Sequence, residues 1–346
     1  MSRLHISRPG LVIPRAVDPS GVAGPTRGQA RGPNWRRTSP GLFVPASVAS
    51  SVPEQRIVEV AAGTPPGAAV TGWAALHWLG AQWFDGTAAD GSPRAVDVAL
   101  GDQRTMAPRP GLRISEQWVP AGHVIEVDGL RVTRPEFSAW HEARAARAFV
   151  RGVMVLDMVV GQDLASLEDL GCYVADYCKG RPGIKRFRSM LLRADENVWS
   201  PQETLMRMDW IAVTGRTPAC NVPIFDLHGH HLLTTDLLDI EHGVAGEYDG
   251  LHHLADGRRR RDLDREEVCR EYGIESVTMM TGGRRDRAAF AQRLLGALRR
   301  GRDRPGRRLW TTDQPAWWVD TSTVVARRSL VGRDREIWLR RGSQPT

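Results

Sequence analysis

The chain has 346 residues, of which 41% are hydrophobic and 25% are charged, so it is long enough for two or three domains with apolar cores. It contains no run of about eighteen apolar residues and no secretory-type N-terminal segment, which excludes a transmembrane helix and favours a cytoplasmic protein with no membrane partner. The formal net charge of +7 is almost entirely due to arginine, since Lys179 and Lys185 are the only lysines; it has the sign that a nucleic-acid partner requires, and a GC-rich genome explains it equally well.

Residues 1–60 are expected to form an N-terminal module with a loosely ordered start rich in glycine, proline and arginine. The segment NWRRTSPGLFVPASV predicts two short strands around Ser39-Pro40-Gly41. A helix is expected from about Pro53, because Ser51 and Glu54 have the spacing of a capping box.

Residues 61–195 predict a mixed α/β region followed by a helical one. A helix is expected from Thr71 through GWAALHWLG, with a buried aromatic face. The segment HVIEVDGLRVT alternates apolar and polar residues around Asp128-Gly129, which predicts a tight β-hairpin. The segments RGVMVLDMVVG and LEDLGCYVADYC then have a helical pattern.

Residues 196–302 predict a further domain, and residues 303–346 form an extension rich in tryptophan and arginine. Within the domain a helix starts at Ser200, and VPIFDLHGHHLLTTDLLDIEHGVAGEYDG predicts a three-stranded meander. A helix, the strand IESVTMM and a last helix, RDRAAFAQRLLGALRR, follow. The expected fold class is therefore α/β (α+β overall).

Several carboxylates crowd the second hairpin of this meander. Glu247 and Asp249 lie on one face of the third strand, because side chains in a strand repeat every two residues. A turn at Glu241-His242 places Asp236 opposite Glu247, and a turn at His242-Gly243 places it opposite Asp249. A three-residue loop instead puts Asp236 on the other face. In the first two registers the carboxylates converge, and Mg²⁺ or Mn²⁺ would relieve their repulsion; otherwise they are solvated strand residues.

This hairpin resembles the D…(D/E)-x-K active-site hairpin of the restriction-endonuclease-like PD-(D/E)XK superfamily. The similarity is closer to its very-short-patch-repair-like branch, in which E-x-D-G is followed by histidine and then by R-D-x-x-R. The matching residues here are Glu247-Tyr248-Asp249-Gly250, His252-His253 and Arg261-Asp262-Leu263-Asp264-Arg265. The segment SPQETLMR resembles the opening helix of the family and carries Glu203. The resemblance covers residues 198–300, and Asp249 stands at the lysine position of the superfamily, as is usual in this branch.

The resemblance implies a mixed sheet flanked by helices and a metal-dependent endonuclease that hydrolyses phosphodiester bonds in DNA, in defence or in DNA repair. Asp236, Glu247 and Glu203 would hold the ion, with Asp249 beside them, while His252 or His253 handles the proton of the attacking water. The residues expected to contact DNA phosphates are Arg258, Arg259, Arg260, Arg261 and Arg265. The alternative is a catalytically inactive DNA-binding regulator or antitoxin that uses the same fold as a scaffold.

Each of these residues also has a plainer interpretation. Glu203 follows Ser200 and Pro201 as in a capping box, and Asp249 before Gly250 can shape a strand end. The arginine run can be a solvated helix face, in which Asp262 and Arg265 form a surface ion pair. The histidines around Gly229 fit an exposed turn better than a zinc site.

The four-residue motif E-x-D-G is not specific by itself, because it also occurs at Glu126-Val127-Asp128-Gly129. Its Asp-Gly pair is fully explained by the hairpin turn, and no aspartate lies upstream at hairpin distance. The longer constellation carries the functional hypothesis.

The N-terminal part resembles abortive-infection antitoxins of the AbiEi type, on the segments NWRRTSPGLFVPA, AAVTGWAALHWLG and GLRVTRPEFSAW. The resemblance implies a winged-helix-like module in which Arg36 and Arg37 contact phosphates; a structural β-turn-β with exposed arginines fits the residues as well. Besides DNA, two protein partners are left open, a second copy of the chain and a toxin-like protein.

Overall fold

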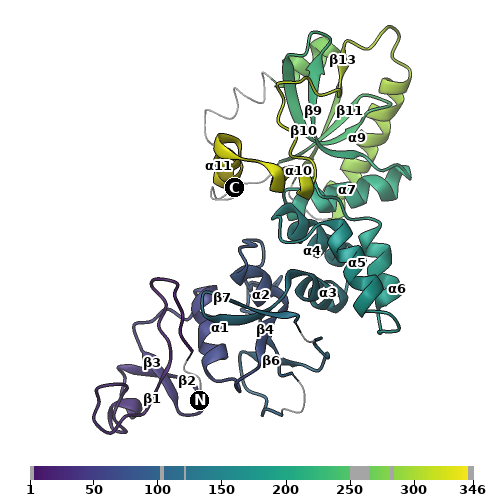
Figure 1. The fold of residues 1–346 in the computed structure, drawn as a ribbon. Helices are drawn as coiled ribbons and strands as arrows, with labels where there is room; N and C mark the ends of the chain where they lie inside the picture. Colours follow the sequence, from purple (N-terminus) through teal and green to yellow (C-terminus); the bar gives the residue numbers. More distant parts are fainter. Residues whose placement is uncertain (1–3, 102–104, 121, 250–264, 281–283, 342–346) are drawn as a thin grey trace. The chain divides into compact units, whose positions relative to one another are not determined.

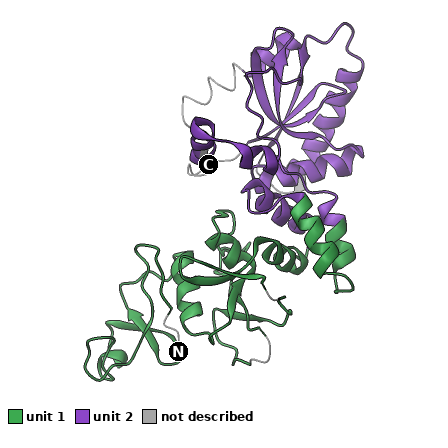
Figure 2. Cartoon of the chain, in the orientation of Figure 1, with its two compact units in different colours: residues 1–147, 168–188 green, residues 148–167, 189–346 purple. Residues whose placement is uncertain are grey.

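The computed structural model describes residues 4–101, 105–120, 122–249, 265–280 and 284–341. The chain divides into two compact units (Figure 2): unit 1 is Met1–Arg147 with Glu168–Arg188, and unit 2 is Ala148–Leu167 with Ser189–Thr346. Helices and mixed sheets make up both units, so the predicted α/β class is confirmed. Among the described residues, no helix is both long and apolar enough to cross a membrane.

Unit 1 begins with a small antiparallel sheet ordered β1-β3-β2 (Figure 1). Its strands are β1 (Arg15–Ala16), β2 (Trp35–Ser39) and β3 (Leu42–Pro45). The last two are the predicted pair, and Gly41 between them has a φ of +75°. A 3-10 turn (Gln29–Arg31) and helix α1 (Pro53–Ala62) accompany the sheet. The described part of this module therefore combines three strands with one 3-10 turn and one α-helix.

Helix α1 starts at Pro53 as predicted, but the predicted capping box is wrong. The N-cap is Val52, and no side chain caps the helix. The reason is Pro53 itself: proline occupies the first helical position, which makes the residue before it the cap and leaves Ser51 outside the helix.

The second sheet of unit 1 has the order β6-β5-β4-β8-β7. Its strands are β4 (Ala69–Thr71), β5 (Val96–Ala99), β6 (Leu112–Ser115), β7 (Val124–Val127) and β8 (Leu130–Thr133). The predicted hairpin is confirmed: Asp128 and Gly129 have φ values of 51° and 78°, the left-handed pair that a two-residue turn requires. Four helices complete this part of the chain: α2 (Gly72–Trp78), α3 (Pro135–Ala145), α5 (Leu167–Tyr177) and α6 (Ile184–Leu191).

The described residues of unit 2 form one sheet, ordered β12-β11-β10-β9-β13 (Figure 1). Its strands are β9 (Ala219–Asp226), β10 (His231–Asp239), β11 (Val244–Asp249), β12 (Glu275–Met280) and β13 (Trp310–Thr311). The first three form the predicted antiparallel meander, whereas β12 pairs with β11 in parallel. A parallel pair requires a crossover connection, and residues 265–272 are helical within it.

Two helices of unit 2 pack over β11. They are α7 (Pro201–Thr214) and α9 (Arg284–Arg302), and the Trp210 and Phe290 rings lie 6.4 Å apart, both fully buried. A Cβ atom at Gly246 would lie 2.9 Å from the Trp210 ring, so this position needs glycine for the helix to approach. A separate apolar cluster joins Leu238 and Ala245 to Cys269 and Ile274.

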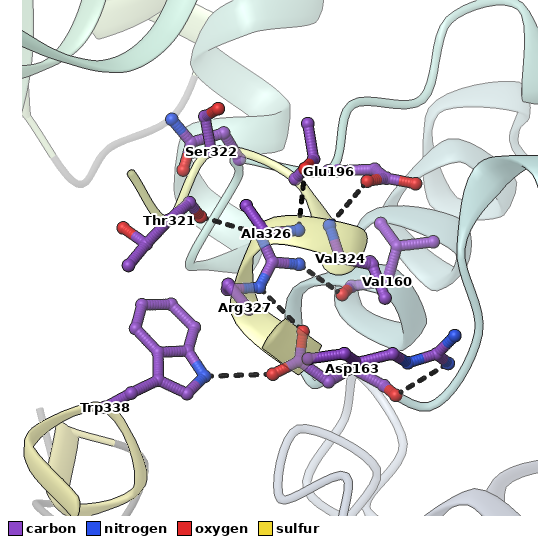
Figure 3. Close-up of polar contacts among 12 residues, drawn as sticks. Val160, Asp163, Glu196, Thr321, Ser322, Val324, Ala326, Arg327 and Trp338 are labelled. Carbon is purple, nitrogen blue, oxygen red and sulfur yellow. Dashed lines mark hydrogen bonds and ion pairs between the residues drawn. The ribbon is translucent and has the colours of Figure 1, made fainter. Parts of the chain in front are cut away.

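The C-terminal extension is tied into unit 2 by a buried arginine (Figure 3). The extension contains helices α10 (Val324–Ser329) and α11 (Gly332–Arg341). Both are bonded to the end of helix α4 (Phe149–Gly161) or the residues just after it, which lie much earlier in the chain. The fully buried Arg327 donates from Nε to Asp163 Oδ1 at 2.6 Å and from Nη2 to the Val160 carbonyl at 2.8 Å. Trp338 Nε1 donates to the other oxygen of Asp163 at 2.9 Å, so one carboxylate secures both helices.

Candidate functional site

The register of the β10–β11 hairpin decides which carboxylates meet. The structure pairs Leu237 with Gly246 and Asp239 with Val244, and residues 240–243 form the loop. Continued by one residue, this register places Asp236 opposite Glu247, as predicted for a turn at Glu241-His242. The observed loop has one more residue at each end than the predicted turn, so the pairing of the strands is the same and each side chain stays on its predicted face.

Asp239 closes this loop and is therefore occupied. Its Oδ1 accepts from the backbone N–H of His242 at 2.9 Å, and its Oδ2 accepts from Arg216 Nε at 2.9 Å. The same arginine forms an ion pair with Glu241. These two carboxylates belong to the loop, which leaves Asp236 and Glu247 as the pair on the strands.

Backbone and side-chain donors hold Asp236 and Glu247 in different ways. The N–H of Tyr248 donates to Asp236 Oδ2 at 2.8 Å. Arg265 forms an ion pair with Glu247, and its Nη2 also donates to the Thr234 carbonyl at 2.7 Å. Asp236 is thus held by a neutral donor, whereas Glu247 has a guanidinium beside it.

Glu203 joins these carboxylates from the first turn of α7. Ser200 is the N-cap, and its hydroxyl accepts from the Glu203 N–H at 3.2 Å, as the sequence predicted. Glu203 Oε2 accepts from the Trp199 N–H at 2.9 Å and from Asn221 Nδ2 at 2.7 Å. Asn221 lies across from Asp236 in the β9–β10 ladder, because Val222 pairs with Thr235 and Cys220 with Leu237. The amide of Asn221 therefore links helix and sheet at the site.

The three carboxylates repel one another. Burial and the charge of Asp236 raise the pKa of Glu203 to about 7, and bonds from Trp199 and Asn221 offset only part of this effect. Burial and Asp236 likewise raise the pKa of Glu247 to about 8, despite the attraction of Arg265. Burial also raises the pKa of Asp236, against the bond from Tyr248. A cation would relieve this strain by favouring the charged forms.

The other predicted site residues are placed as follows. Asp249 is exposed at the end of β11, two residues beyond Glu247 and so on the same strand face. His252 and His253 lie outside the described residues, as do the four consecutive arginines Arg258, Arg259, Arg260 and Arg261.

The two N-terminal arginines differ from each other. Arg36 donates to both oxygens of Glu59, at 2.7 and 2.9 Å, so a structural partner holds its guanidinium. Arg37 is exposed and bonds the Ser39 carbonyl at 3.3 Å. Of the pair, Arg36 therefore has a carboxylate partner and Arg37 has none among the described residues.

Two contributions were not evident from the sequence. Asn221 has no motif to mark it; its φ of 46° and its contacts to Glu203 follow from the fold. Arg265 was expected on DNA through its place in R-D-x-x-R, whereas the structure pairs it with Glu247.

In the part of the chain that the structure describes, no group of three or more His, Cys, Asp or Glu side chains is arranged as a ready metal cage. The oxygen donors of Glu203, Asp236 and Glu247 nevertheless suit a hard divalent cation in chemical type. Comparison with known proteins found no match: no protein-family model, no curated protein and no solved structure matches this chain.

Proposed function

We propose that unit 2 is a metal-dependent DNA endonuclease with a restriction-endonuclease-like fold. One observation carries the proposal: Asp236 and Glu247 lie opposite each other in the register of the β10–β11 hairpin, and Asn221, across from Asp236, bonds the buried Glu203 of α7. The charge of Asp236 raises the pKa of both glutamates. Carboxylates that are buried or half-buried are rarely placed together without a compensating charge, and strongly perturbed titratable groups cluster at functional sites. The resemblance of E-x-D-G, the histidine pair and R-D-x-x-R supplies the reaction class.

Mg²⁺ or Mn²⁺ fits the donors by type, since the site offers carboxylate oxygens. When bound, such an ion lowers the pKa of a water and neutralises charge that develops on a phosphate. The residues that would hold it are Asp236, Glu247 and Glu203, with Asp249 at the open end of β11. Trp199 and Asn221 orient Glu203, and the Tyr248 N–H orients Asp236, so two of the three ligands are held before an ion arrives.

In this proposal Arg265 positions Glu247 through their ion pair and can also contact the DNA. Its side chain is 39% exposed while it contacts Glu247, so it has room to meet a phosphate at the rim of the site. His252 or His253 would carry the proton, as the resemblance implies.

The proposal predicts metal-dependent cleavage that depends on Glu247. We expect the purified protein to nick or cut plasmid or single-stranded DNA with Mg²⁺ or Mn²⁺ and not with EDTA. Glu247→Gln should lower the rate by about 100-fold or more, which corresponds to ~2.7 kcal/mol of transition-state stabilisation. Gel-based rates over a metal titration measure this effect.

The chain provides its own matched control in the second E-x-D-G motif. Glu126→Gln changes the same residue type in the same four-letter context, at an exposed strand position, and should leave the rate unchanged. Cleavage that survives in EDTA, or that is equally fast in Glu247→Gln, would refute the proposed site.

A specific observation favours a second candidate, a catalytically inactive DNA-binding regulator on the same scaffold. Arg265 supplies Glu247 with positive charge from within the chain, which is the charge that a metal would otherwise supply. This candidate predicts DNA binding that is unchanged by EDTA and no cleavage with either metal. Isothermal titration with Mg²⁺ separates the two, because only the nuclease should bind the ion at Glu247.

A further inference from the structure

A strongly basic segment of unit 1 was given no role by the nuclease proposal. Residues 178–188 follow α5 and continue into α6. They contain five lysines and arginines and no acidic residue, and they include both lysines of the chain. Arg144 and Arg147, at and beyond the end of α3, lie beside this segment: Arg186 Nη2 donates to the Arg147 carbonyl at 3.1 Å. We call the set Arg144, Arg147, Lys179, Arg181, Arg186 and Arg188 the α5–α6 basic surface.

These cations have no carboxylate partner among the described residues, and several of them contact or face one another. Arg36, Arg94 and Arg113 each form an ion pair with a glutamate or aspartate. Among the described residues, no carboxylate lies within ion-pair distance of any member of the α5–α6 basic surface. Within the part of the chain that the structure describes, this positive charge is not neutralised by an ion pair.

The fold holds some of these guanidiniums close together despite their repulsion. The Arg144 guanidinium lies over the Trp140 ring, 5.7 Å from its centre, and its stem packs against Gly183. Arg181 Nη1 donates to the Trp118 carbonyl at 3.3 Å and lies over that ring at 5.5 Å. Burial and the charge of Arg181 both lower the pKa of Arg144. An anion between them would remove this repulsion.

Exposed aromatic rings border the same surface. Trp118 is 57% exposed beneath Arg181, and Tyr177, 44% exposed, immediately precedes the basic segment. Flat rings beside guanidiniums suit nucleic acid, in which bases stack and phosphates take two hydrogen bonds from one arginine. A lipid surface would need an exposed apolar helix face, but Phe187 of α6 is buried against Trp140, with ring centres 5.1 Å apart.

We infer that the α5–α6 basic surface binds the phosphate backbone of nucleic acid, with Trp118 and Tyr177 available to exposed bases. This contact is separate from the carboxylate site of unit 2, and it holds whether or not that site cleaves DNA.

The test is DNA binding by the full-length chain in EDTA, where no cleavage interferes. Fluorescence anisotropy with a labelled DNA duplex of arbitrary sequence gives the affinity between about 50 and 200 mM salt. The triple variant Lys179→Gln, Arg181→Gln, Arg188→Gln should bind at least ~10-fold more weakly. Its log–log salt slope should fall by about 3, since each phosphate contact contributes roughly 0.9.

A charge-matched control replaces three exposed arginines on other elements of unit 1: Arg15→Gln, Arg27→Gln and Arg131→Gln. It should keep the wild-type affinity and slope. Because Arg181 contacts Trp118, a second variant, Lys179→Glu with Arg188→Glu, changes only exposed side chains that have no hydrogen bond or ion pair within the described residues. This variant should weaken binding as strongly. Thermal melts verify that every variant is folded.

Three results would overturn the inference: wild-type affinity in both charge variants, an equal loss in the control, or a loss of binding to phosphatidylserine vesicles with DNA binding intact. The last would assign the surface to a membrane. Glu126→Gln, outside both sites, should bind DNA like the wild type in this assay. The assay in EDTA reads no cleavage and the cleavage assay reads metal dependence, so a failed nuclease proposal and a failed binding surface give different results.

Discussion

At the residue scale, Glu203 is a carboxylate in a position where burial and a neighbouring carboxylate disfavour its charged form. It is 8% exposed. Its carboxylate accepts from the backbone N–H of Trp199 and from Nδ2 of Asn221, and both donors are neutral. Asp236 and Glu247 add their charge nearby, so the metal-free site stores electrostatic repulsion. That repulsion lowers the stability of the folded chain, and the proposed cation would relieve it.

This view predicts that removing the charge stabilises the metal-free protein. Folded-state pKa values of about 7 and about 8, raised from 4.5, mean that the folded chain keeps protons that the unfolded chain has released. The stabilisation that the protonated groups give the folded state is therefore fully present below about pH 4.5, and it is lost as the pH rises through about 8. Glu203→Gln keeps an oxygen to accept both bonds and should melt higher than wild type at about pH 8 in EDTA, by ~2–4 °C per kcal/mol relieved.

Differential scanning fluorimetry over the pH range measures this difference, which should vanish near about pH 5. Added Mg²⁺ should raise the melting temperature of the wild type more than that of the variant, because only the wild type keeps all three carboxylates. An equal or lower melting temperature for Glu203→Gln at the alkaline end would contradict the stored repulsion.

At the scale of elements, single side chains fix how distant segments join. Helices α10 and α11 depend on Asp163, whose two oxygens bind Arg327 and Trp338 (Figure 3). Arg327 is fully buried, so water cannot solvate its charge. The guanidinium is instead stabilised by Asp163 and by the carbonyls of Val160 and Thr321. The extension is thus an integral part of unit 2.

Arg327→Leu should destabilise unit 2 by about 3 kcal/mol, because it leaves a partly buried carboxylate without its cation. The same change at Arg333, an exposed residue of α11, should cost little. Urea denaturation measures both, and limited proteolysis should show earlier cleavage after residue 302 in the first variant. Equal stability of the two variants would show that the anchor contributes nothing.

At the scale of the whole molecule, the chain passes between its units more than once, since residues 148–167 belong to unit 2. The buried Asp157 in that segment accepts from Arg207 Nη2 and from Thr204 Oγ1, both at 2.7 Å. Arg207 and Thr204 lie on α7, the helix that carries Glu203. The support of the candidate site therefore begins well before residue 196, where the sequence predicted the last domain to start.

A fragment of residues 148–346 should accordingly unfold cooperatively. Residues 196–346 should be less stable by at least about 3–5 kcal/mol, since Arg207 then loses Asp157 and Arg327 also loses Asp163. Circular dichroism melts of the two fragments make the comparison. If the shorter fragment were equally stable, the Asp157–Arg207 pair would not support α7.

The sequence by itself determined the elements whose signals are local. Asp128-Gly129 specified its hairpin and Ser200 with Pro201 specified the start of α7, because turn and cap preferences act within a few residues. It also reduced the β10–β11 hairpin to a few registers, as strand periodicity allows. The tertiary structure chose among them, through a loop closed by Asp239 with Arg216, and it placed Asn221 on Glu203 and Arg265 on Glu247. Those partners lie up to 23 residues apart, and burial and charge pairing depend on distances in space that local preferences do not encode.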